Sequence, residues 1–139
     1  MPREPAQYIR FAIREIDPSS GVPQGLFQVA SAVRDDPTTP NYDVERLAEL
    51  MWWFSVNLAR PTRFDRNLAK RYSSFHKRGI SWFKASANEQ ISMMREMAVV
   101  LTENGYLIDQ IETDRPGYLI YEDEHQIVAE PFADTPTSN

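Results

Sequence analysis

The densest group of side chains that could bind a metal or transfer a proton is Glu122-Asp123-Glu124-His125. A hard cation needs several oxygens that converge on one point, and zinc combines histidine with further ligands. Consecutive turn residues point in different directions, and the only other histidine is His76. The simpler interpretation is therefore a solvated hairpin turn. The alternative is a small metal-dependent hydrolase or nucleic-acid-processing enzyme that uses this cluster.

Other catalytic arrangements are absent from the sequence. No serine lies in a nucleophile elbow, the five glycines form no phosphate-binding loop, and there is no cysteine. We therefore predict no catalytic residue, no metal site and no cofactor, and the sequence favours a non-enzymatic protein.

Charge is distributed unevenly along the chain. Residues 60–84 carry a net charge of +7, so the total of −5 leaves −12 on the other 114 residues. Such an asymmetry bears on partners and on electrostatic steering rather than on fold. The cations that we expect to contact a partner are Arg63, Arg66, Lys70, Arg71, Lys77 and Arg78.

Three interpretations of this basic segment stay open: a solvated loop, a docking site for an acidic protein, and a single-stranded nucleic-acid site. Aromatic residues are interleaved with the cations, as in proteins that stack bases. The pI of about 5.0 argues against a dedicated nucleic-acid-binding protein. We expect Trp82 and Phe83 to be strand residues, with at least one of them in the core. The other aromatic residues are Phe64, Tyr72 and Phe75.

Two tryptophans lie outside the core stripe of a predicted helix. Residues 42–60 show helical spacing of apolar side chains, from which Trp52, Trp53 and Val56 deviate. Either the 61–79 connection or another helix covers these side chains, or they form an exposed patch for a partner or a homodimer. The core stripe consists of Val44, Leu47, Met51, Phe54 and Leu58, widened by Ala48 and Leu50.

The remaining pattern predicts an α+β domain. A strand over 80–83 precedes a helix that Ser86 and Glu89 would cap and Asn104-Gly105 would end. Strands over 106–113, 118–121 and 126–130 follow as a meander, and the strand–helix–strand unit should be parallel. Upstream, a strand over Tyr8–Ile16 precedes a helix with Pro23 in its first turn, and Asn41 would cap the helix after that.

We thus expect one mixed sheet of about five strands with about three helices mainly on one face. The single domain should span 8–132, between a flexible N-terminus (1–7) and a flexible tail (133–139). The chain has no secretory signal and no apolar run of the roughly 18–20 residues that a membrane span requires. A cytoplasmic protein without membrane association is expected.

Four blocks of sequence carry a resemblance. YIRF at Tyr8–Phe11, QGLF at Gln24–Phe27, WFK at Trp82–Lys84 and RPGYLIYEDEHQIVAEPF at Arg115–Phe132 resemble a family of small, uncharacterised bacterial proteins. The resemblance covers most of the chain and implies a bacterial single-domain protein. It implies no activity, cofactor or catalytic residue.

The sequence as a whole favours an interaction or regulatory protein. Its basic segment would dock an anionic partner, most simply a protein or a second copy, and Trp52 and Trp53 would anchor it.

Overall fold

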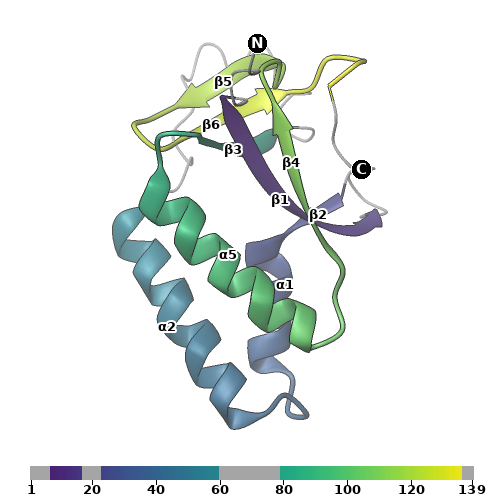
Figure 1. The fold of residues 1–139 in the computed structure, drawn as a ribbon, viewed down its shortest axis with the longest axis vertical. Helices are drawn as coiled ribbons and strands as arrows, with labels where there is room; N and C mark the ends of the chain where they lie inside the picture. Colours follow the sequence, from purple (N-terminus) through teal and green to yellow (C-terminus); the bar gives the residue numbers. More distant parts are fainter. Residues whose placement is uncertain (1–6, 17–22, 60–78, 136–139) are drawn as a thin grey trace, which may run out of the picture.

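The computed structural model describes residues 7–16, 23–59 and 79–135, and within them it confirms the predicted α+β single domain. Figure 1 shows the helices α1, α2 and α5 gathered at one end of the molecule and the β5–β6 hairpin at the other. The elements in chain order are β1 (Tyr8–Ile16), β2 (Pro23–Gly25), α1 (Leu26–Asp35), α2 (Asn41–Asn57), β3 (Ile80–Lys84), α5 (Asn88–Glu103), β4 (Ile108–Thr113), β5 (Tyr118–Glu122) and β6 (Gln126–Glu130).

Strand β1 organises the sheet because it pairs on both of its edges. β4 pairs along most of its length on one edge, while β3 and the short β2 pair with its two ends on the other. β6 continues the sheet from β3, and β5 pairs with β6. Each of these ladders is antiparallel.

Two details of the predicted topology are therefore wrong. β3 and β4 run in the same direction, as predicted for the strand–helix–strand unit, but β1 lies between them, so the described ladders are antiparallel and the sheet is not the mixed sheet that was expected. Because β4 pairs with β1 and not with β5, only β5 and β6 form a hairpin where a three-strand meander was expected.

The helices pack against one another and cover one face of the sheet. Ile9, Phe11 and Ile13 project from β1 into this core, as their alternation in the sequence predicts. α2 contacts mainly α1 and α5, so it is the outer member of the helical layer. The helical residues buried in this core are Leu26, Val29, Ala30, Val33, Leu47, Leu50, Phe54, Ile91, Met94, Met97, Val100 and Leu101.

The helix starts differ from the prediction. Ala87, not Ser86, is the N-cap of α5, and no side chain caps that helix. The Ala87 N–H donates to the Lys84 carbonyl (2.9 Å), so Ser86 belongs to a tight turn before the helix begins. Likewise Pro40 precedes α2 at the cap position where Asn41 was expected, and Pro23 starts β2 rather than a helix.

The opposite face of the sheet is also buried, which the alternating pattern did not predict. Arg10 lies on this face at 8% exposure, and its Nη1 donates to the Ser81 carbonyl (3.3 Å). Burial lowers the pKa of Arg10 from its ordinary value to about 10, so Arg10 remains charged at neutral pH. The apolar members of this second cluster are Ala12, Ile80, Trp82, Ile111, Ile127 and Ala129.

Both predicted glycine turns are present. α5 ends at Glu103, before Gly105 at φ +95°, and Gly117 at φ +130° precedes β5. Within the part of the chain that the structure describes, no helix combines the length and apolar character needed to cross a bilayer.

Candidate functional site

After Tyr42, the most exposed large apolar side chains of the described helices are Trp52 and Val56, which lie on the outward face of α2. Leu47, Leu50 and Phe54 turn the other face of this helix into the core. Trp52 is 67% exposed and Val56 is 63% exposed, four residues apart on the same face. The predicted position of Trp52 outside the core stripe is therefore confirmed, whereas Ala48, which was expected to widen the stripe, is exposed.

Trp53 has a different environment from Trp52. It is partly buried against the main core, and its ring meets that of Phe54 edge to face at a centroid distance of 5.1 Å. Phe54 also contacts Phe27 (4.9 Å) and Phe83 (6.4 Å), so Trp53 forms the outer end of an aromatic chain that reaches the sheet. Only part of the Trp53 ring is therefore accessible to a partner.

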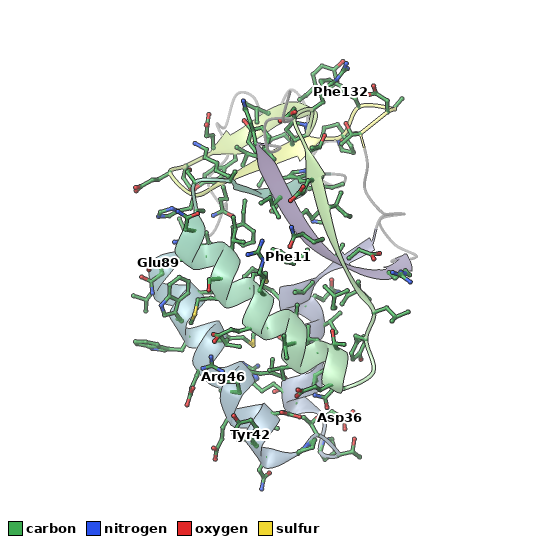
Figure 2. All side chains as sticks on the ribbon, in the orientation of Figure 1. Phe11, Asp36, Tyr42, Arg46, Glu89 and Phe132 are labelled. Carbon is green, nitrogen blue, oxygen red and sulfur yellow. The ribbon has the colours of Figure 1, made fainter. Side chains whose placement is uncertain are left out.

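An open hollow of about 530 Å³ lies beside the two indoles, where α2 meets α5. Arg46, labelled in Figure 2, joins the two helices: its Nη2 pairs with Glu96 of α5 (2.6 Å) and its Nη1 with Glu49 (3.1 Å). The two charged residues that line it, Arg46 and Glu49, are paired with each other, and its other described lining residues are apolar. The lining residues are Arg46, Ala48, Glu49, Trp52, Trp53 and Met93.

Two buried glutamines fix the end of α2 next to this hollow. The Gln90 amide on α5 donates to the Asn57 carbonyl (3.0 Å), and the Gln126 amide on β6 donates to the Ala59 carbonyl. Both glutamines are at most 5% exposed. They satisfy carbonyls that a helix end leaves without partners. The sequence offered no signal for them, because a glutamine in a helix or strand is typical of a solvent-facing position.

The predicted basic contacts Arg63, Arg66, Lys70, Arg71, Lys77 and Arg78 lie outside the described residues. The described end of the basic segment is folded into the sheet. Trp82 and Phe83 are 1% and 7% exposed, which confirms them as core strand residues and leaves neither ring available to stack a base. Lys84 pairs with Glu122 across 2.6 Å, so that cation is already neutralised.

The Glu122–His125 turn uses its carboxylates for structure. Asp123 accepts hydrogen bonds from the His125 N–H (2.9 Å), the Gln126 N–H (3.0 Å) and the Tyr121 hydroxyl (2.7 Å). The Gln126 side-chain amide adds a fourth at 3.0 Å, the same amide group that reaches Ala59. Within residues 7–16, 23–59 and 79–135, no three metal-binding side chains converge.

Hydrogen bonding controls the charge of Asp123. Partial burial is the largest single influence on its pKa and would raise it. The four hydrogen bonds together outweigh burial, so the pKa of Asp123 lies below its usual value. Asp123 is therefore an ionised organiser of the turn and does not have the raised pKa of a general acid.

Another ion pair joins the two strands of the β1–β4 ladder. Arg14 makes a bidentate pair with Asp109, at 2.8 Å and 3.3 Å, and this pairing raises the pKa of Arg14. Asp109 is 5% exposed and stands directly opposite Ala12 in the register. The pair links the two strands, and neither residue lines the hollow between α2 and α5.

Comparison with known proteins gives no relative: no family model, no curated protein and no solved structure matches this chain. The resemblance of the four sequence blocks to a bacterial family stays a prediction.

Proposed function

We propose that this chain is a non-enzymatic docking protein that binds an acidic protein partner on the outward face of α2 and in the adjoining hollow. The observation that carries this proposal is Trp52, which is 67% exposed beside an open hollow lined by a second tryptophan and Met93. Tryptophan supplies a large contact area with few rotatable bonds, and aromatic anchors often provide most of the binding energy of an interface.

The charge pattern supports an acidic partner. The +7 segment starts at Arg60, three residues after α2 ends at Asn57. We assign its cations from Arg63 to Arg78 the role of steering the partner, because charges at the rim of an interface mainly raise the association rate. The two glutamines that hold Asn57 and Ala59 fix the point from which this segment leaves α2.

We place this docking in the bacterial cytoplasm. The chain has no cysteine, which suits a reducing compartment, and the resemblance of its four sequence blocks is to bacterial proteins. The metal-dependent and nucleic-acid alternatives have less support, since Asp123 is committed to the turn and Trp82 and Phe83 are buried.

The test uses a labelled amphipathic peptide of about 20 residues, with leucine along one helical face and glutamate elsewhere. A second peptide has lysine in place of each glutamate. Fluorescence anisotropy should show binding of the acidic peptide and weak or no binding of the basic one. Trp52→Ala should weaken binding about tenfold or more.

Leu107→Ala is the matched control, because Leu107 is 60% exposed but does not line the hollow. It should bind the acidic peptide as the wild type does. Equal binding of both peptides, or equal effects of the two substitutions, would overturn the proposal.

A further inference from the structure

Asn104-Gly105 is the only asparagine–glycine step in the sequence. At such a step the backbone nitrogen of the glycine can attack the side-chain amide carbon of the asparagine, because glycine has no side chain that hinders the approach. A C–N bond forms, and the amide nitrogen leaves as ammonia with the proton of the attacking nitrogen. Water then opens the resulting cyclic imide to aspartate or isoaspartate. The net reaction consumes water, releases ammonia and replaces an amide with a carboxylate.

The folded end of α5 holds this step in a conformation that prevents the attack. The Gly105 N–H donates to the Thr102 carbonyl (3.1 Å) and the Tyr106 N–H to the Leu101 carbonyl (3.1 Å), which are the two hydrogen bonds of a Schellman motif. The ψ of Asn104 is +17°, so the Gly105 nitrogen nearly eclipses the backbone nitrogen of Asn104 and lies away from its Cβ. Ring closure needs the opposite arrangement, with the attacking nitrogen close to the side chain. The reaction therefore requires this end of the helix to open.

The Asn104 side chain also ties this end of α5 to α2. Its Nδ2 donates to Asp43 Oδ2 (3.1 Å) and to the Val100 carbonyl (2.8 Å). Asp43 lies in the first turn of α2, so a single amide joins the start of one helix to the end of the other. The Arg46–Glu96 pair joins the same helices nearer their middle. The junction at Asn104 can thus open locally, which takes less free energy than unfolding the whole domain.

We propose that Asn104 is a deamidation site that reacts only while this junction is open, and that its product hinders the junction from closing again. Conversion puts a carboxylate where Nδ2 now donates to Asp43 and Val100. Two carboxylates and a carbonyl would then meet where each needs a donor, and the like charges would repel. The new negative charge would also lie at the C-terminal end of a helix, where the helix dipole disfavours it. Deamidation is therefore a one-way change that separates the start of α2 from the end of α5.

The reaction can be followed on the full chain at mildly alkaline pH by peptide mapping with mass spectrometry. Asn104 should convert much more slowly in the folded protein than in urea. Asp43→Ala removes one acceptor of the Asn104 amide and should speed conversion about fivefold, the factor that a typical hydrogen bond is worth. The control Glu45→Ala removes an exposed acid from the same helix and should leave the rate unchanged.

Two results would overturn control by the junction. One is the same rate of conversion in the folded and the urea-unfolded chain. The other is an Asp43→Ala rate no higher than that of Glu45→Ala, including the case in which Asn104 stays intact in both folded variants.

The effect of the product is tested with Asn104→Asp. Hydrogen exchange of the Gly105 and Tyr106 amides, which close the end of α5, should be about tenfold faster than in the wild type. Asn88→Asp makes the same change at an exposed position at the other end of α5 and should leave both amides protected.

Adding Asp43→Asn to Asn104→Asp sets an amide opposite the new carboxylate and should recover part of the lost protection. Exchange in Asn104→Asp at the wild-type rate would show that the product does not open the junction. A double variant without any recovery would show that the loss does not come from the contact with Asp43. Either result would overturn the proposed effect of the modification.

Discussion

At the scale of single residues, two adjacent tryptophans have different environments. Trp52 points to solvent, whereas Trp53 packs against Phe54 and the core. A helix turns by about 100° per residue, which is enough to place neighbours in different environments. The sequence pattern predicted that both lie outside the core stripe. Their different exposure became evident only from the packing of α2 in the structure.

Alanine substitution should distinguish the two. Trp52→Ala should change the free energy of unfolding by less than about 1 kcal/mol, because the side chain buries little surface. Trp53→Ala should cost about 2 kcal/mol, through lost aromatic contact and a partly filled cavity. Urea denaturation followed by circular dichroism measures both values. Equal losses would contradict the different environments.

Gly117 and Gly105 provide a second comparison between residues. A Cβ on Gly117 would overlap the Glu130 carbonyl oxygen and lie 2.8 Å from Pro131 Cα, at a φ of +130°. Gly105 also has a positive φ, +95°, but open space around it. We expect Gly117→Ala to cost about 3 kcal/mol, from strain and backbone overlap, and Gly105→Ala about 1 kcal/mol, from strain alone.

Thermal and urea unfolding of both alanine variants give the two costs. Similar losses at the two positions would show that β5 can move away from the β6–Pro131 backbone and relieve the overlap.

Asp123 should make stability depend on acidity. Its folded pKa lies below the unfolded value of about 3.8, so its contribution is present above about pH 4 and is lost as pH falls through the folded pKa. Asp123→Asn should destabilise the protein by about 1 kcal/mol at pH 7. This loss is smaller than that expected for a fully buried charged hydrogen bond, because the Asp123 carboxylate is partly exposed.

The difference between wild type and Asp123→Asn should shrink at pH 3. Urea titrations at the two pH values measure it. Glu124→Gln is the control, since the Glu124 side chain is 87% exposed, and it should show no such difference. A gap that stays constant between pH 7 and pH 3 would contradict an ionised role for Asp123.

At the scale of elements, local patterns predicted the helices and most strands, while pairing required long-range information. The alternation from Tyr8 to Ile16 gives β1 with the bounds observed, and Asn104-Gly105 marks the end of α5. The pairing of β4 with β1 joins Ile108 to Ile13, which are 95 residues apart in the sequence. Nothing in either segment distinguishes that partner from the nearer β5.

The second buried face shows a further limit of local patterns. Arg10 between Ile9 and Phe11 gives β1 the alternation of a half-exposed strand. In the structure Arg10 is buried, and Trp82 lies on the same face at 1% exposure. Burial of an arginine depends on what the rest of the chain places over it, and a period-two pattern cannot contain that information.

The end of α2 shows how elements position the candidate site. Gln90 and Gln126 reach from α5 and β6 to the Asn57 and Ala59 carbonyls. These two hydrogen bonds hold the residues at the end of α2, up to Ala59, against α5 and the sheet. The sequence pattern placed Trp52 outside the core stripe and left its exposure open, and it gave no signal for the two buried amides.

At the scale of the whole molecule, α2 is the outer helix (Figure 1), and in the sequence the basic segment begins three residues after α2 ends. In the docking that we propose, long-range attraction from the +7 segment and short-range contact through Trp52 would be separable contributions. The first acts before contact and depends on ionic strength. The second acts after contact and depends on buried apolar area.

Raising the salt concentration from about 0.1 M to about 1 M shortens the screening length from about 10 Å to about 3 Å. For the acidic peptide, we expect the association rate constant to fall about tenfold and the dissociation rate constant to change much less, because rim charges act mainly on encounter. Stopped-flow anisotropy resolves both constants. Trp52→Ala should show the opposite behaviour, with faster dissociation and an unchanged dependence of association on salt. A salt effect confined to dissociation would mean that the cations form close pairs within the complex and do not steer from its rim.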